Sequence, residues 1–135
     1  MKEVAFFGGL PFFVLLIVLF YLLGWSSMAL TFLVGLVLLY ALTIAIRYFY
    51  FKHRPSRKDY TNIVEKINVS SFPSLHTGRA FFICILLLES DWVIGILFLF
   101  IAILVGLSRI YIRKHYLIDV VGGAVMGIVL AFLLP

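Results

Sequence analysis

Two histidines, one aspartate and three arginines occur at spacings that suit phosphate chemistry. They lie in three motifs, Arg47-x6-Arg54-Pro55, Pro73-Ser74-Leu75-His76 and Ser108-Arg109-x5-His115-x3-Asp119. Guanidinium groups bind phosphate oxygens through paired N–H donors, and imidazoles act as nucleophiles, acids or bases near neutral pH. Long apolar segments separate the motifs, so these charged groups lie at a membrane edge, where they are costly unless they are used. The pattern indicates phosphoryl chemistry on a membrane-held substrate.

The third motif contains the candidate nucleophile, His115. A neutral ring nitrogen can attack phosphorus and form a phosphohistidine, which divides hydrolysis into two steps. Asp119 lies four residues later, on the same face of an expected helix. We expect its carboxylate to accept the other ring N–H and fix the tautomer. The alternative is a polar contact between helices with no catalytic role.

The second motif contains the candidate general acid, His76. It would protonate the leaving lipid alcohol and later help to activate water. Ser74 is expected to cap the helix that starts there, so that the first amides and the positive end of the helix dipole remain for phosphate oxygens. A histidine facing water and a purely structural cap are the alternatives for these two residues.

The basic residues divide into two groups. Arg47, Arg54 and Arg109 are expected to hold the non-bridging oxygens and to stabilise charge in the transition state. Others are expected to extend toward anionic lipid head groups. This second group comprises Lys52, Arg57, Lys58, Arg113 and Lys114.

Composition determines the class of element that carries these motifs. Hydrophobic residues make up 64% of the 135-residue chain and charged residues 13%, which predicts an all-α, polytopic transmembrane bundle in a single domain, 1–135, with the catalytic motifs within 47–119. The apolar runs are continuous, which argues against a membrane barrel. A net charge of +5 beside membrane segments favours lipid head groups or a phosphate over nucleic acid. Cys84 is the single cysteine, and no cluster of acidic or cysteine ligands occurs, so we expect catalysis without a metal or cofactor.

The apolar segments predict about five membrane helices. The expected ranges are 4–23, 28–46 with an extension past Arg47, 74–88, 92–107 and 115–134, with a short surface helix near 62–67. With five crossings, the ends of the second and fourth helices share a membrane face with the starts of the third and fifth. The three motifs should therefore meet. The spacing Gly123-x3-Gly127 permits close helix contact, although ordinary membrane-helix composition explains these glycines equally well.

Together the motifs resemble the signature of the type 2 phosphatidic acid phosphatase superfamily, which includes membrane lipid phosphate phosphatases and vanadium-dependent haloperoxidases. The family pattern is Lys-x6-Arg-Pro, Pro-Ser-Gly-His and Ser-Arg-x5-His-x3-Asp. The third motif is complete, whereas Leu75 stands in place of the glycine and Arg47 in place of the lysine. The resemblance implies metal-independent catalysis by His115, His76 and Asp119. It implies a phosphate site made by Arg47, Arg54, Ser74, Leu75, His76 and Arg109.

The predicted function is hydrolysis of a phosphomonoester or diphosphate lipid, such as phosphatidic acid, phosphatidylglycerophosphate or a polyprenyl phosphate or diphosphate. Two alternatives remain open: a lipid phosphotransferase that uses the same histidine, and a non-catalytic membrane protein that binds anionic lipids. Expected partners are the phosphorylated substrate and membrane lipids, and a homo-oligomer is left open. All 11 Lys and Arg lie on the motif face, so the positive-inside rule predicts a multi-pass protein of the cell membrane with a cytoplasmic active face.

Overall fold

The computed structural model describes residues 1, 3–56 and 59–134, and all the regular elements within them are helices. The elements are a 3-10 helix η1 (Val4–Gly8) and the α-helices α1 (Leu10–Leu22), α2 (Ser26–Phe49), α3 (Ile63–Val69), α4 (Leu75–Ser90), α5 (Trp92–Tyr111) and α6 (Leu117–Leu133). Both α2 and α5 are long and apolar enough to cross a membrane, whereas α1 and α6 are apolar but shorter. The predicted all-α membrane bundle is confirmed as a fold class.

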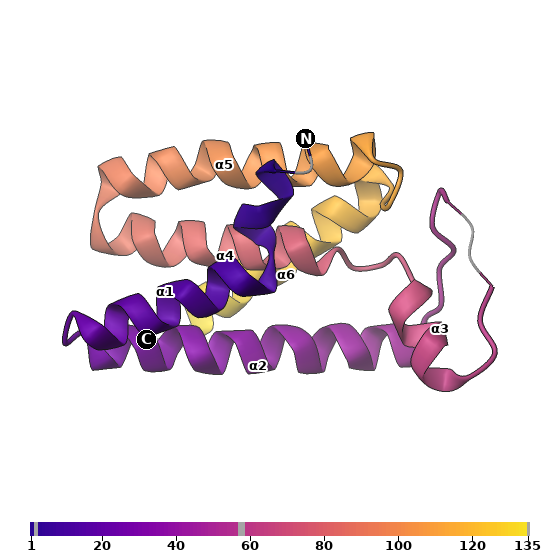
Figure 1. Cartoon of the computed structure of the whole chain (residues 1–135), viewed down its shortest axis with the longest axis horizontal. Coiled ribbons are helices and arrows are strands. Elements are labelled where there is room, and N and C mark those ends of the chain that lie inside the picture. Colours follow the sequence, from indigo (N-terminus) through magenta and orange to yellow (C-terminus); the bar gives the residue numbers. More distant parts are fainter. Residues whose placement is uncertain (2, 57–58, 135) are drawn as a thin grey trace.

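Helix α4 is the centre of the bundle and packs against both α5 and α6 (Figure 1). A Cβ atom at Gly127 would lie 2.2 Å from the carbonyl oxygen of Gly78, and one at Gly123 would lie 2.2 Å from that of Ser74. The backbones of α4 and α6 therefore touch, as the glycine spacing permitted. This contact brings the start of α6 beside the start of α4, where the second and third motifs lie.

Three buried phenylalanines connect α1, α2 and α4. The ring of Phe32 lies 5.4 Å from that of Phe13 and 5.9 Å from that of Phe82, measured between centroids. A Cβ at Gly35 would lie 2.0 Å from the Phe82 ring, so α2 can approach α4 here only because it carries a glycine. This packing fixes the direction of α2 and hence the position of its last turn, which carries Arg47.

The first predicted helix is broken. Gly9 is extended, with φ −76° and ψ 159°, and it separates η1 from α1. Pro11 lies in the first turn of α1, where its missing N–H costs no hydrogen bond. Instead of the one helix expected over 4–23, the chain therefore has a 13-residue helix and a separate turn that packs against α4 and α5.

Two boundaries near the third motif also differ from the prediction. Helix α5 continues to Tyr111, so Arg109 is on the helix rather than at its end. Helix α6 begins at Leu117, so His115 lies in the connector before it. Asp119 alone of the histidine–aspartate pair is helical, and this difference changes the hydrogen bonds in the site.

Candidate active site

The buried loop of residues 70–74 joins the three motifs. The amide of Ser71 donates to the carbonyl of Lys52 at 2.8 Å, and its hydroxyl donates to the carbonyl of His53 at 3.2 Å. The amide of Ser74 donates to the carbonyl of Asp119 at 2.9 Å. Segments from the first, second and third motifs thus converge, as the expected topology requires.

Two arginines of the first motif hold the segment that leads into this loop. The guanidinium of Arg47 donates to the carbonyls of Ile67 at 3.2 Å and Pro73 at 2.9 Å. That of Arg54 donates to the carbonyl of Asn68 at 2.8 Å. Arg47 is only 8% exposed, and its bond to Pro73 is buried, whereas the bond from Arg54 to Asn68 is exposed. Both arginines therefore position the loop, and their role in phosphate binding stays a prediction.

His115 is fixed by a backbone carbonyl. Its Nδ1 lies 2.7 Å from the carbonyl oxygen of Ser71, and the residue is 3% exposed. Because a carbonyl only accepts, Nδ1 carries the proton, and the lone pair of the neutral ring is on Nε2. Burial, reinforced by the charges of Arg54 and Arg109, lowers the pKa of His115 to about 3. The ring is thus neutral near pH 7, as a nitrogen nucleophile must be.

The carboxylate of Asp119 does not orient His115 as expected. The distance between its Oδ2 and the Nδ1 of His115 is 3.9 Å, which is too long for a hydrogen bond. Oδ1 instead accepts from the Nζ of Lys52 at 2.6 Å, and Oδ2 accepts from the amide of Tyr116 at 2.7 Å. Since α6 starts at Leu117, Asp119 is the third residue of that helix and caps its start.

Lys52 was expected to extend to lipid head groups, but it pairs with this fully buried carboxylate. It lies inside the variable x6 stretch of the first motif, where no spacing rule singles it out. The predictions for Arg57 and Lys58 lie outside the described residues. Arg113 and Lys114 are exposed, in keeping with the prediction for them.

His76 is half-buried and lies in electrostatic range of Arg109, Arg79, His115 and Lys114. The structure therefore brings the two predicted catalytic histidines into one charged environment. Ser74 is at the N-cap position of α4, as predicted, but its hydroxyl pairs with that of Thr77 at 3.0 Å and caps no amide.

Arg47 and Leu75, the two residues that differ from the family pattern, lie close together. Both residues line one groove of about 370 Å³ beside α3, together with Tyr40, Thr43, Ile44, Val64, Ile67 and Asn68. Tyr40 also accepts a hydrogen bond of 3.0 Å from the guanidinium of Arg79, which is 2% exposed. Arg79, which belongs to none of the three motifs, is thus buried in this region like Arg47 and Arg109.

Each of four arginines in this region has one buried N–H donor without an acceptor among the described residues. The buried Nε atoms of Arg47, Arg54, Arg79 and Arg109 have no hydrogen-bond acceptor in the part of the chain that the structure describes. A cavity of about 340 Å³ borders Arg109, and Ala5, Ile112 and Lys114 complete its lining. Buried donors on converging cations fit an anion with several oxygens, such as a phosphate.

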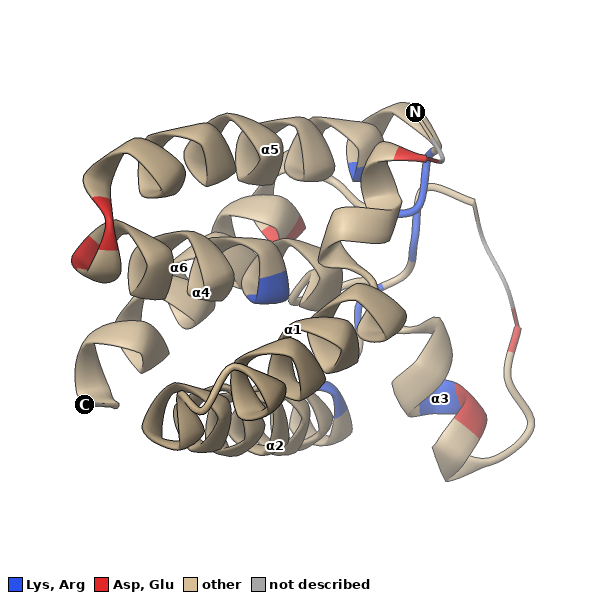
Figure 2. Cartoon of the chain, turned by 60° about the vertical axis from the view of Figure 1, so that its left-hand side comes forward, with Lys and Arg blue, Asp and Glu red and all other residues tan. Residues whose placement is uncertain are grey.

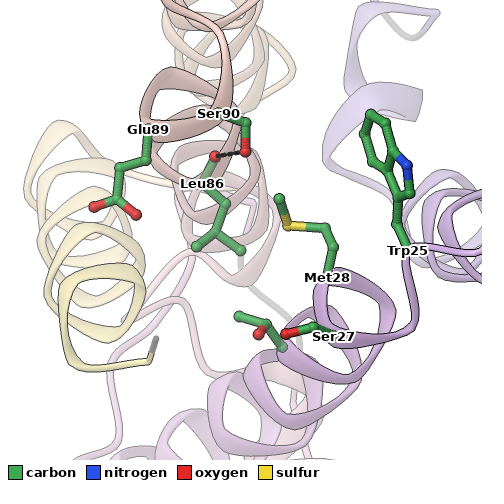
Figure 3. Close-up of a pocket in the computed structure, with 7 residues that line it drawn as sticks. Trp25, Ser27, Met28, Leu86, Glu89 and Ser90 are labelled. Atoms are coloured by element: carbon green, nitrogen blue, oxygen red, sulfur yellow. Dashed lines mark hydrogen bonds between the residues drawn. The ribbon is translucent and has the colours of Figure 1, made fainter.

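The opposite end of the bundle has a different character. Glu89 and Asp91 lie where α4 meets α5, whereas the lysines and arginines that the structure describes lie toward the motif end (Figure 2). A pocket of about 480 Å³ opens at this far end between Trp25, Met28 and Glu89 (Figure 3). No motif residue lines this pocket, so we assign the candidate active site to the basic end.

Comparison with known proteins agrees with the motifs. Undecaprenyl-diphosphatase BcrC of Bacillus subtilis (strain 168) is 37% identical over 101 residues, which cover 73% of this chain and 50% of that protein. The chain thus spans about half the length of this curated relative. No solved structure matches the present chain. The family model described as PAP2 superfamily matches residues 28–135, a range that holds all three motifs, and the chain therefore belongs to the PAP2 superfamily.

Proposed function

We propose that the chain is a membrane lipid phosphate phosphatase in which His115 carries the phosphoryl group between the lipid and water. The observation that supports this most strongly is the state of His115. Its ring is buried and neutral, the Ser71 carbonyl holds Nδ1–H, and Nε2 keeps a lone pair. Arg54 and Arg109 lie within electrostatic range of the ring, where they can attract a phosphate.

The reaction has two balanced steps. In the first, Nε2 of His115 forms a bond to the terminal phosphorus while the bond from that phosphorus to the oxygen of the leaving lipid alcohol or lipid phosphate breaks, and His76, in its imidazolium form, gives its proton to that oxygen. In the second, a water oxygen bonds to phosphorus as the N–P bond breaks, and the proton of the water returns to His76. Phosphate is one product, and the other is the lipid alcohol from a phosphomonoester or the lipid monophosphate from a diphosphate.

The arginines serve different parts of this reaction. Arg109 and Arg54 act on the charge of the transferring group, because both influence His115 directly. Two guanidinium nitrogens of Arg47 donate to backbone carbonyls, so Arg47 mainly keeps the loop with Ser71 in place. This division accommodates an arginine where the family pattern has a lysine, since a lysine cannot bind two separated carbonyls in one plane.

An apolar groove supports a lipid as the substrate. It has a volume of about 540 Å³ and runs along α6 from Phe72 and Ile118 to Leu133, with Leu42 of α2 on its other side. Phe72 belongs to the loop that contacts His115, so a chain in this groove would lie next to the nucleophile. The relative's name, undecaprenyl-diphosphatase, makes a polyprenyl diphosphate the first substrate to test.

The charge distribution supports a multi-pass arrangement with the motif end in the cytoplasm. Its physical basis is the excess of Lys and Arg at that end over the acidic turn of Glu89 and Asp91. Reporter fusions at residues 60 and 134 test this orientation. The proposal requires a cytoplasmic signal from the first and an extracytoplasmic signal from the second, and the reverse pattern would overturn it.

The activity is tested with purified protein, excess EDTA and a panel of undecaprenyl diphosphate, phosphatidic acid and phosphatidylglycerophosphate. The wild type is expected to release phosphate, whereas His115→Ala should release at least about a thousandfold less, because the nucleophile is gone. His53→Ala is the matched control, since His53 is exposed. Transfer of label to an added alcohol in place of water would favour a phosphotransferase, and release that survives His115→Ala would exclude the proposed nucleophile.

A further inference from the structure

Lys52 and Asp119 form a buried ion pair next to the proposed nucleophile. The Nζ of Lys52 lies 2.6 Å from Oδ1 of Asp119, whose side chain is fully buried, while 23% of the lysine side chain is exposed. The ammonium group also lies 4.9 Å from the centre of the Tyr116 ring. An ion pair this close, with one partner fully buried, fixes the position of both groups.

Both carboxylate oxygens of Asp119 are in use. Oδ1 accepts from Lys52, and Oδ2 accepts from the amide of Tyr116 at 2.7 Å. The same Oδ2 remains 3.9 Å from the Nδ1 of His115, which bonds to Ser71 instead. With the Lys52 ammonium removed, Asp119 would be an uncompensated buried anion, and its nearest titratable neighbour would be the imidazole of His115.

We propose that Lys52 is a positioning residue for the reaction: by pairing with Asp119 it keeps the carboxylate from capturing His115, which stays neutral and bonded to Ser71. This inference rests on the proposed function only in giving His115 a catalytic task. The balance of charges supports it. Burial, Arg54 and Arg109 lower the pKa of His115, and Asp119, which raises it, is the smallest of the contributions.

The groups around this pair and around the two predicted catalytic histidines come from every neighbouring element. They are Arg47 of α2, Lys52 and Arg54 of the connector that follows it, His76 and Arg79 of α4, Arg109 of α5, and Lys114 and Tyr116 of the connector before α6. Apart from Tyr116 and His76, all of these groups are cationic. Asp119 is therefore the group whose release from its partner would most directly favour a charged His115.

The test follows the titration of the histidine rings by NMR in substrate-free protein labelled with ¹⁵N-histidine, in detergent micelles. The three histidines are assigned with His53→Gln and His115→Gln. In Lys52→Met the midpoint for His115 is expected to rise by at least about one pH unit, because a buried carboxylate within hydrogen-bond reach favours imidazolium. Lys52→Arg keeps the charge and should keep the wild-type midpoint.

The double variant Lys52→Met/Asp119→Asn separates this role from a general loss of structure. Both charges of the pair are gone, so the His115 midpoint should return toward that of the wild type. If Lys52→Met does not fold, Lys52→Gln replaces it with the same expected direction. A His115 midpoint that stays within about 0.3 unit of wild type in the single variant would overturn the proposal.

Kinetics then distinguish positioning from phosphate binding. In Lys52→Met the acid limb of kcat/KM should move to higher pH together with the NMR midpoint. A rise in KM with an unmoved substrate-free midpoint would identify Lys52 as a phosphate ligand and overturn the positioning role. Because the NMR midpoint needs no turnover, a protein that hydrolyses no lipid phosphate would refute the proposed function without changing the result for Lys52.

Discussion

At the scale of single residues, the nucleophile candidate is oriented by the backbone. The carbonyl of Ser71 accepts from Nδ1 of His115, and no side-chain substitution removes a carbonyl. The acceptor can be lost only if the 70–74 loop moves, and Arg47 holds that loop through the carbonyl of Pro73. The correct tautomer of His115 therefore depends on the tertiary structure around the loop.

The pH dependence of stability tests the buried, neutral state of His115. Its pKa is about 3 in the folded protein and near 6.5 in an unfolded chain, so the unfolded state binds the extra proton between these values. The contribution of His115 is fully present above about pH 6.5 and is lost as pH falls, by about 1.4 kcal/mol per unit. The melting temperature of the wild type should thus drop more steeply between pH 6.5 and 4.5 than that of His115→Gln.

His53→Gln is the control for this comparison, because that ring is exposed. Its melting curve should follow the wild-type slope. Parallel slopes for the wild type and His115→Gln would mean that His115 titrates normally and is not held neutral by its surroundings.

At the scale of elements, the contact of α4 with α6 brings the second and third motifs together. Gly127→Ala would place a methyl group 2.2 Å from the carbonyl oxygen of Gly78, so the two backbones must separate. We expect a loss of roughly 1–3 kcal/mol in the free energy of unfolding, and reduced phosphate release as the start of α6 moves from Ser74. Thermal unfolding and the phosphate assay measure both effects.

The exposed Phe132 on the same helix, outside the lining of the apolar groove, provides the matched control. Phe132→Ala removes apolar contacts on an outer face without inserting atoms between helices, and it should leave both measurements near wild type. If Gly127→Ala behaves like this control, the helices are not in backbone contact.

The helices were largely predictable from apolar runs, and the convergence of motifs followed from their order along the chain. The short helix predicted near 62–67 is present as α3. The side chain of Asn62 caps it by accepting from the amide of Glu65. The break at Gly9 was not, because apolar content alone does not distinguish one long helix from a turn and a short helix. The late start of α6 had the largest consequence, because helical spacing between His115 and Asp119 holds only if both residues are helical.

Lys52 illustrates a limit of a different kind. A lysine beside a membrane segment ordinarily extends to the head groups, and only the three-dimensional approach of the connector to α6 reveals its partner. Arg79 is similar, since its bond to Tyr40 joins residues that are 39 positions apart. Charge and spacing therefore identified the motifs, whereas the partners of the cations required the fold.

At the scale of the whole molecule, the basic end that carries the three motifs adjoins an apolar groove along α6. Because α6 has 17 residues, the groove follows a helix of about 25 Å, which is most of the thickness of a hydrocarbon core. A lipid chain can lie there while its phosphate reaches the basic end. Under the proposed function, the groove predicts that hydrolysis depends on the length of the lipid chain.

Filling the groove tests this arrangement. Val125→Trp puts a large ring among its lining residues and should raise KM about tenfold or more for undecaprenyl diphosphate, because chain contacts are lost. A short-chain diphosphate that does not reach Val125 should be hydrolysed as by the wild type. Val37→Trp, at an exposed position of α2 outside this lining, should change neither substrate, and equal losses for both substrates would argue against the groove.

The most direct test of the central claim is to trap the phosphoenzyme. Wild-type protein is mixed with a substrate labelled in its terminal phosphorus, quenched within one turnover, digested and analysed by mass spectrometry. The account predicts one phosphoryl group on the His115 peptide, stable in base and labile in acid, and none in His115→Gln. A phosphoryl group on another residue, or lipid hydrolysis with no labelled protein at any time point, would contradict it.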